Sequence, residues 1–197
     1  MLEIVQYPHP ALRYSSRSVT EIDDNLRATI RAMFDLMYAA NGIGLAANQV
    51  ALPYRLFVTN VTGDPAVTEA ERIFINPEIL RRKGSAEEEE GCLSLPQLYG
   101  QVRRSEKILV DAFDLDGEEF ELALDELEAR VVQHENDHID GVLFIDRMTE
   151  AARRELESRL ADFESHFLRQ QESGLVPPDD EIQRTLRSLE PAPVPAG

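Results

Sequence analysis

A His-Glu-x-x-His motif, formed by His134, Glu135 and His138, is the feature of this chain that most clearly could do chemistry. Residues four positions apart share a helix face, so the two imidazoles could bind one metal ion. Glu135 would then lie beside the open coordination position, where a water binds. The motif predicts a catalytic metal site. In the alternative interpretation, neighbours satisfy the histidines, and Glu135, Asp137 and Asp140 form a solvated helix face.

Two imidazoles leave such a site one protein ligand short, because catalytic zinc-type sites normally have three. Cys92, the one cysteine of the chain, lies in the segment Glu90–Pro96. A lone cysteine is most often a small buried apolar residue, but a divalent ion deprotonates a coordinating thiol. Phe144 stands where the metzincin proteases require a third histidine. Glu157 or Glu164 from a following helix could also serve, so spacing leaves the third ligand open.

The hydrophobic pattern predicts an α+β scaffold for these residues. Apolar side chains recur at helical spacing from Leu26 to Met37, before Asn41 and Gly42. Apolar runs bounded by polar residues predict three short strands, which are Leu56–Val58, Ile73–Ile75 and Ile108–Val110. Asp116 and Gly117 have the signature of a hairpin turn between Phe113 and Phe120.

The metal-binding helix itself has predicted ends. Asp125 with Glu128 predicts a capping box at its start, and Gly141 would stop it. Its side chains expected to face the core are Leu127, Val131 and Val132. A charged helix from Thr149 to about Ser173 follows, with an apolar stripe of Leu156, Leu160, Phe163 and Phe167. We therefore expect mixed or antiparallel short strands packed around a central metal-binding helix, with N-terminal and C-terminal helices.

The segment Asn41–Gln49 contains small residues that permit close backbone approach. Alone it is equally typical of a helix end followed by packing residues. Together, however, Gly42–Gln49, Glu90–Ser94 and Gln133–His138 resemble, in order and spacing, the three signature motifs of the peptide deformylases. The resemblance covers roughly residues 1 to 165, and it includes the segments Tyr7–Arg13, Ile75–Glu78 and Gly141–Phe144.

The resemblance implies a role for particular residues. It makes Cys92, His134 and His138 the ligands of a divalent metal, natively Fe²⁺ and replaceable by Ni²⁺, Co²⁺ or Zn²⁺. Glu135 becomes the general base and acid. The residues that would steady the developing oxyanion are Gln49 and, through its backbone N–H, Leu93. The backbone around Ile43 and Gly44 would pair with an extended substrate peptide, and Glu90 would form an ion pair with Arg104 behind the ligands.

The reaction implied is hydrolysis of the N-formyl group from nascent peptides that begin with formyl-methionine, with release of formate. Two other classes remain open beside this metal-dependent hydrolase. A zinc endopeptidase would share the helix motif and take its third ligand downstream of His138. A noncatalytic metal-binding or partner-binding relative would keep the ligands without needing Glu135.

Three positions depart from the family pattern. Tyr99 stands where many bacterial members have an arginine that contacts the substrate backbone, so weaker peptide binding is expected. Asn48 replaces a common proline or threonine, which we expect to matter little because that position varies. Glu128 replaces a common apolar residue on the metal-binding helix.

Composition limits the partners of the chain. A formal charge of −17 and a pI near 4.6 argue against direct affinity for nucleic acid, so any transient ribosome contact must be local. One cysteine excludes an internal disulfide framework and fits a reducing compartment. No segment resembles a signal peptide or approaches the roughly 18 apolar residues of a membrane span. We expect a soluble cytoplasmic protein without membrane contact.

The chain changes character after Gly174. We expect a catalytic domain over residues 1–173 and a Pro-rich, flexible tail over residues 174–197. Prolines bracket the stretch Glu181–Leu189, which could form at most a small helix in a loosely held segment.

Overall fold

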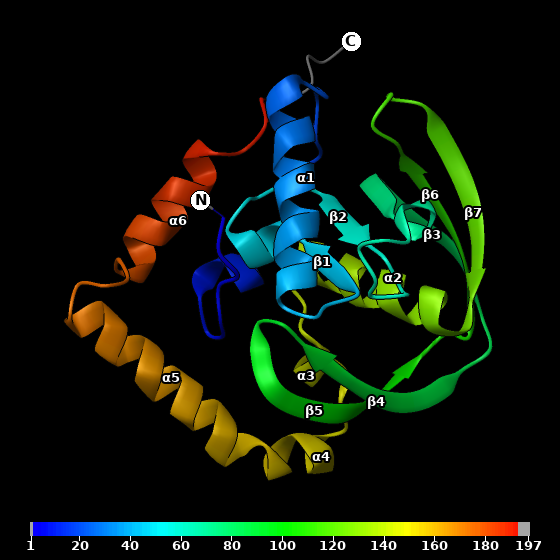
Figure 1. Cartoon of the computed structure of the whole chain (residues 1–197). Coiled ribbons are helices and arrows are strands. Elements are labelled where there is room, and N and C mark those ends of the chain that lie inside the picture. The colour runs from blue at the N-terminus through cyan, green and yellow to red at the C-terminus, as the bar shows by residue number, and fades with distance from the viewer. Residues whose placement is uncertain (1, 193–197) are drawn as a thin grey trace.

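A computed structural model describes residues 2–192 of the chain. Its principal sheet has five antiparallel strands in the order β1-β2-β3-β6-β7. Their bounds are β1 Gly44–Ala46, β2 Leu56–Thr59, β3 Arg72–Lys83, β6 Lys107–Phe113 and β7 Glu119–Asp125. The second sheet is the hairpin of β4 (Ala86–Cys92) and β5 (Leu95–Arg104), which curves below the first in Figure 1. The predicted α+β class and antiparallel strands are confirmed.

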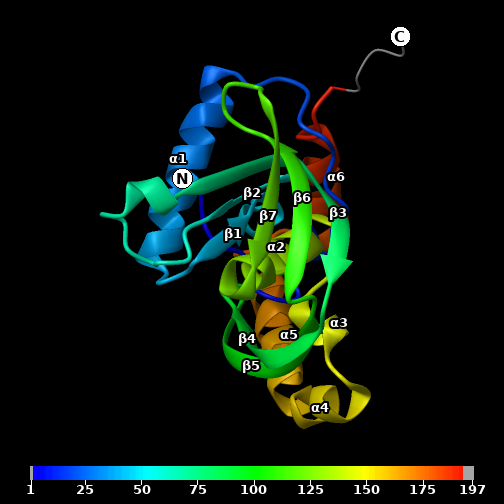
Figure 2. The same ribbon diagram turned by 90° about the vertical axis from the view of Figure 1, so that its right-hand side faces the viewer.

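The two faces of the large sheet are covered by different helices, because successive strand residues point to opposite sides. Leu56 and Val58 of β2 pack in one cluster with the apolar stripe of α1 (Asp24–Ala39). Phe57 between them packs with α2 (Glu126–Ile139) in a second cluster. Figures 1 and 2 show α1 and α2 on either side of these strands. The predicted first helix and the turn between β6 and β7 both form.

The predicted N-terminus of the metal-binding helix needs correction. Asp125 is the N-cap residue of α2, but its side chain makes no capping hydrogen bond. Instead it lies 3.7 Å from Lys107 Nζ, and Glu128 lies 3.6 Å from Arg72 Nε. Both carboxylates therefore face cations of neighbouring strands, and no capping box forms. At the other end Gly141 has a φ of +76°, a left-handed conformation that glycine adopts without strain and that ends the helix.

The C-terminal part of the chain forms three helices in place of one helix and a tail. A break at Leu156 divides the predicted charged helix into α4 (Glu150–Glu155) and α5 (Glu157–Glu172). Short α3 (Phe144–Arg147) precedes them, and α6 (Asp179–Ser188) follows. Ile182 and Leu186 of α6 are buried, so this stretch differs from the loosely held segment expected from composition. Pro193 and Pro195 of the expected tail lie outside the described residues.

Three 3-10 helices complete the fold. They are η1 (Pro10–Arg13), η2 (Ala47–Val50) and η3 (Thr68–Ala70). The second of them, η2, follows β1 directly and places Gln49 next to α2. Within residues 2–192, no helix is both long and apolar enough to cross a membrane.

Candidate metal centre and active site

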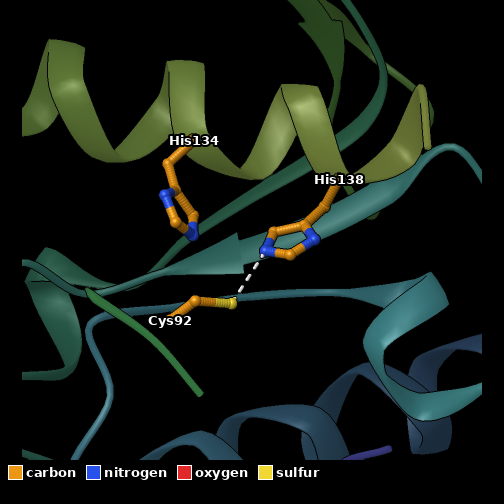
Figure 3. A group of neighbouring side chains, drawn as sticks. All are labelled: Cys92, His134 and His138. Atoms are coloured by element: carbon orange, nitrogen blue, oxygen red, sulfur yellow. Dashed lines mark hydrogen bonds between the residues drawn. The ribbon is translucent and has the colours of Figure 1, made fainter. Parts of the chain in front are cut away.

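Three side chains from two distant segments meet beneath α2. His134 and His138 lie one turn apart on this helix, and Cys92 is the last residue of β4, where the β4–β5 register shifts. Their ligand atoms lie within 4.8 Å of one another, and Cys92 Sγ is 3.2 Å from His138 Nε2 (Figure 3). Neither Glu157 nor Glu164 joins this group within the described residues. Glu164 instead accepts a hydrogen bond from the Tyr7 hydroxyl, at 2.8 Å.

This set of donors fits a divalent transition metal. One thiolate and two imidazoles are three protein ligands of a catalytic site, which leaves a position for water or substrate. Burial lowers the pKa of His138, which favours the neutral imidazole that a metal requires. Burial acts in the same direction on His134, but hydrogen bonds with Cys92 and Glu90 outweigh it and raise the pKa of His134 to about 10.

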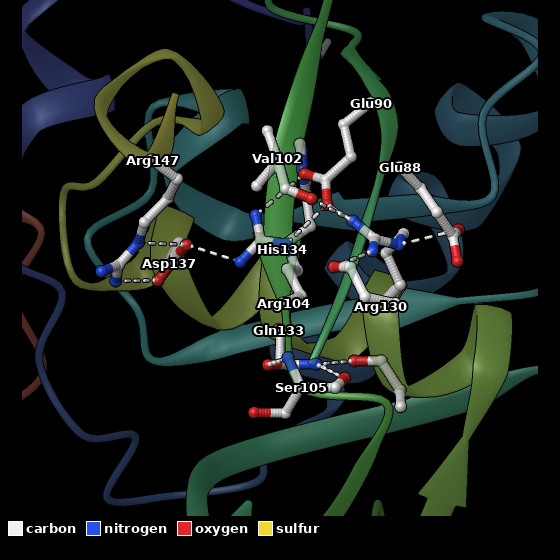
Figure 4. A network of polar contacts seen from close by, with 12 residues as sticks. Glu88, Glu90, Val102, Arg104, Ser105, Arg130, Gln133, His134, Asp137 and Arg147 are labelled. Carbon is white, nitrogen blue, oxygen red and sulfur yellow. Dashed lines mark hydrogen bonds and ion pairs between the residues drawn. The ribbon is translucent and has the colours of Figure 1, made fainter. Parts of the chain in front are cut away.

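Glu90 holds His134 in place from behind. Its carboxylate lies 3.0 Å from His134 Nδ1 and accepts hydrogen bonds from the Arg104 Nε and Nη2 atoms at 2.6 and 2.9 Å (Figure 4). Arg130 Nη1 donates a further bond, at 2.6 Å. Burial alone would raise the pKa of Glu90, but the bonds from His134 and Arg104 prevail and lower it to about 2. The carboxylate is thus ionised and leaves His134 Nε2 free to face Cys92.

The roles of Arg130, Asp137 and Arg147 in this network are not evident from the sequence. Asp137 accepts a hydrogen bond from Arg104 Nη1 at 2.8 Å and a bidentate pair from Arg147 at 2.6 and 3.0 Å. Arg130 lies four residues before His134, and Asp137 three after it. Helical spacing alone would have placed both residues on the same face as the ligand, although it names no partners for them.

Glu135 is buried beside the ligands and points at the first strand. Burial raises the pKa of its carboxyl to about 7, and its Oε2 atom has no hydrogen-bond partner among the described residues. A methyl group at Gly44 would lie 2.9 Å from the Glu135 carboxyl carbon, so only glycine fits there without displacing the acid. A carboxyl group that titrates near neutral pH can both accept and return a proton.

Gln49 reaches the same space from the opposite side. Its Oε1 atom accepts a hydrogen bond from the Ala46 N–H at 2.8 Å, which fixes the orientation of the amide. The Nε2 group then lies 3.6 Å from Cys92 Sγ and 3.3 Å from Ser94 Oγ. Its neighbour Asn48 is fully buried and donates a hydrogen bond to the backbone carbonyl of His138. Asn48 therefore links η2 to α2, and the expectation that its departure from the family pattern matters little stays a prediction.

A cleft of about 650 Å³ opens over these groups. The site residues that line it include Ile43, Gly44, Gln49, Cys92, Leu93, Tyr99, His134 and Glu135. Strand β1 is an edge strand of the large sheet, so its outer backbone groups face no other strand. Tyr99 is 59% exposed at the cleft wall, with its ring over Gly91. Leu127, expected in the core, is 47% exposed and lines the cleft instead, while Val131 and Val132 are buried.

An α+β domain that gathers a thiol, two imidazoles and a buried carboxyl at one site has the functional groups of a metallohydrolase. The sequence model of the polypeptide deformylase family matches residues 1–154, and the chain belongs to this family. The resemblance of its three motifs is thereby confirmed.

Individual relatives agree. The chain is 46% identical over 175 residues to the peptide deformylase of Rhodopirellula baltica. The matched region covers 89% of this chain and 87% of the relative. It is 40% identical over 179 residues to the chloroplastic/mitochondrial peptide deformylase 1B of Arabidopsis thaliana, covering 90% and 64%.

Solved structures share the fold. The crystal structure of Arabidopsis thaliana peptide deformylase 1B with an inhibitor matches with a TM-score of 0.83 and 40% identity, over 90% of this chain and 97% of that one. The Plasmodium falciparum peptide deformylase matches with a TM-score of 0.81 and 38% identity, over 87% and 98%.

Proposed function

We propose that this chain removes the N-formyl group from nascent peptides that begin with formyl-methionine, and releases formate. The observation that carries the proposal is one cleft holding three kinds of group. Cys92, His134, Glu135 and Gln49 line it, and the buried His138 completes the Cys/His/His group 3.2 Å from Cys92 Sγ. Family membership supports the same reaction.

We propose Cys92, His134 and His138 as the ligands of a divalent ion, with Fe²⁺ as the native metal and Zn²⁺, Ni²⁺ or Co²⁺ as substitutes. A bound ion would activate a water and polarise the formyl oxygen. The thiolate makes the site softer than a site with a carboxylate in that place, which suits iron(II) as well as zinc.

Glu135 would be the general base and then the general acid. It would take the proton of the attacking water and pass it to the leaving amine. Its pKa, raised by burial to about 7, suits both directions of transfer near neutral pH. The unpartnered Oε2 atom is free to accept that proton.

Gln49 and the backbone N–H of Leu93 would stabilise the oxyanion that develops on the formyl group. The Gln49 Nε2 group is already aimed toward Cys92, and its orientation is held by the Ala46 N–H. Preorganised donors of this kind typically contribute about a hundredfold or more to the rate.

The substrate peptide would bind as an additional strand along the outer edge of β1. An extended chain can pair there with the backbone around Ile43 and Gly44, while side chains enter the cleft. Tyr99 at the cleft wall would offer a hydroxyl and a ring to the peptide. We propose the cytoplasm as the compartment, as for a bacterial enzyme that meets nascent chains, with at most a transient local contact to the ribosome.

The test is formate release from formyl-Met-Ala-Ser by protein loaded anaerobically with Fe²⁺ or Ni²⁺. Formate should appear in step with the free amino terminus, and chelated protein should produce neither. Mass spectrometry of longer formylated peptides separates the alternatives. An endopeptidase would cut internal bonds and leave the formyl group in place, and a noncatalytic relative would leave the peptides intact.

A further inference from the structure

The C-terminal helix α6 packs against the N-terminal segment, which lies below the candidate active site. Ile182 and Leu186 are 6% and 1% exposed, and they form a buried cluster with Ala11 and Phe167. The residues that pack against this group, here called the α6 cluster, are Val5, Tyr14, Ala51 and Val176. Figure 1 shows α6 beside the N-terminal segment, joined to the domain by the long α5. The family model ends at residue 154, so α6 lies beyond it.

The N-terminal segment in the α6 cluster is bonded directly to two residues below the cleft. The Val5 N–H donates to the backbone carbonyl of Gln49 at 2.9 Å. The Tyr7 N–H donates to the carbonyl of Ser94, also at 2.9 Å. The side chains of Gln49 and Ser94 are themselves joined by a 3.3 Å hydrogen bond. A shift of this one segment would therefore move both residues.

Ala51 gives a second, independent link. It caps η2, two residues after Gln49, with a φ of +56°. A left-handed conformation is unfavourable for alanine, so surrounding contacts must hold it. Ala51 packs against the α6 cluster, and that cluster is therefore among the contacts that keep η2 in this strained form.

Polar contacts also hold the C-terminal end of α6 against the N-terminal segment. Glu190, just after α6, accepts a hydrogen bond from the Tyr14 hydroxyl at 2.5 Å and from Arg17 Nε at 3.1 Å. Tyr14 follows η1 and packs in the α6 cluster with its ring. The helix is thus attached to the N-terminal segment by apolar and polar contacts together.

We infer that α6 positions Gln49 for catalysis, with Leu186 and Ile182 as positioning residues that act through Val5 and Ala51. This inference rests on the oxyanion role proposed for Gln49. Removing apolar volume at Leu186 lets the N-terminal segment and η2 relax, and the Nε2 donor loses its alignment. Because an oxyanion exists in the transition state and not in bound substrate, the loss should lower kcat and leave KM unchanged.

The experiment compares matched leucine truncations in the full chain. Leu186→Ala removes a buried side chain, and Leu168→Ala removes one that is 56% exposed on α5. With metal loaded and the temperature well below both melting points, Leu186→Ala should lower kcat about fivefold, with KM within twofold and the metal content unchanged. Leu168→Ala should match the parent, and Leu186→Met, which restores the volume, should recover most of kcat. Ile182→Val, a milder deletion in the same cluster, should lower kcat about twofold.

Amide hydrogen exchange provides a readout that does not depend on turnover. The Val5 and Tyr7 amides should exchange faster in Leu186→Ala than in Leu168→Ala, while amides of α2 stay unchanged. A parent kcat in Leu186→Ala, with or without a lower melting temperature, overturns the inference, and so does unchanged exchange at Val5 and Tyr7. Absence of formate release by the unmodified protein would refute the proposed function instead, and the exchange comparison would still test the contact of α6.

Discussion

The metal-binding helix α2 buries charged and polar side chains, whereas the C-terminal helix α6 buries only two aliphatic ones among the described residues. Arg130 and Asp137 can remain in the interior because they have specific ionic partners, and burial of Glu135 favours its neutral form by raising its pKa. Ile182 and Leu186 need only an apolar surface of the right shape. The first region should therefore respond to loss of single atoms, and the second mainly to loss of volume.

The largest effect is expected at the sulfur ligand. Cys92→Ala should lose tight metal binding and with it detectable formate release, because two imidazoles alone leave the site a ligand short. Elemental analysis after dialysis against a weak chelator measures this directly. A full metal content in Cys92→Ala would assign the third ligand to another residue, and Glu164→Ala is the matched control.

A single-atom change at Glu135 separates binding from chemistry. Glu135→Gln keeps all three ligands, so its metal content should equal that of the parent. Its kcat should fall about 10³-fold, since the amide cannot accept the proton of the water. Near-normal turnover by this variant would remove Glu135 from the mechanism.

Residues 177–197, which include α6, should contribute more to stability than their composition suggests. Removing residues 177–197 exposes the apolar surface that Ile182 and Leu186 cover, so the free energy of unfolding should fall by about 3 kcal/mol. Urea unfolding of both proteins measures the difference. Leu175→Ala, at a side chain that is 78% exposed, is the control and should change stability little. A truncated chain as stable as the parent would show that the α6 cluster is energetically neutral.

The pH dependence of stability tests the packing around the α6 cluster with a smaller expected effect. His9 accepts a hydrogen bond from the Ala11 N–H and lies edge-on to Phe167, with 6.0 Å between ring centroids. Burial lowers the pKa of His9 to about 4, partly opposed by Asp179. Below about pH 6.5, His9 binds a proton in the unfolded chain but not in the folded one. Its protonation therefore lowers the free energy of unfolding as the pH drops from 6.5 to 4, and has no effect above 6.5.

The contribution of His9 between pH 7 and pH 5 should be about 2 kcal/mol. His9→Asn keeps a side-chain acceptor without a titrating ring, and it should lose less stability than the parent over that interval. Urea unfolding of both proteins at the two pH values gives the difference. Equal losses in the two proteins would mean that the imidazole is protonated in the fold.

The two regions also differ in how much the sequence could predict. The ligand helix was predictable because His134 and His138 share a face by spacing alone, and the α+β scaffold followed from periodic apolar residues. The ion pairs of Arg130 and Asp137 were not, because their partners come from β4, β5 and α3, and pairing across the fold depends on tertiary distance. Periodicity predicts Leu127 in the core, yet this position of α2 faces the cleft.

The C-terminal helix was underestimated for a different reason. Prolines at 177 and 178 and many polar residues are typical of a linker, and only Ile182 and Leu186 are buried in ten helical residues. Two residues four apart are too weak a pattern to predict docking. Their burial depends on Phe167 of the preceding helix and on Ala11, which is far away in the sequence.

The smallest effect is expected at Tyr99, where the site departs from the usual family pattern. Its exposure at the cleft wall favours contact with the peptide over a role in the core. An arginine there could give a charge-assisted hydrogen bond to a peptide carbonyl, whereas tyrosine offers one neutral donor and a ring. If the contact is equal in ground and transition states, Tyr99→Arg should lower KM severalfold with little change in kcat. This corresponds to about 1 kcal/mol of additional binding free energy. Tyr99→Phe tests the hydroxyl alone. Steady-state kinetics on formylated tripeptides measures both variants. An unchanged KM in both would show that Tyr99 does not contact the substrate, and that the cleft recognises the peptide through β1.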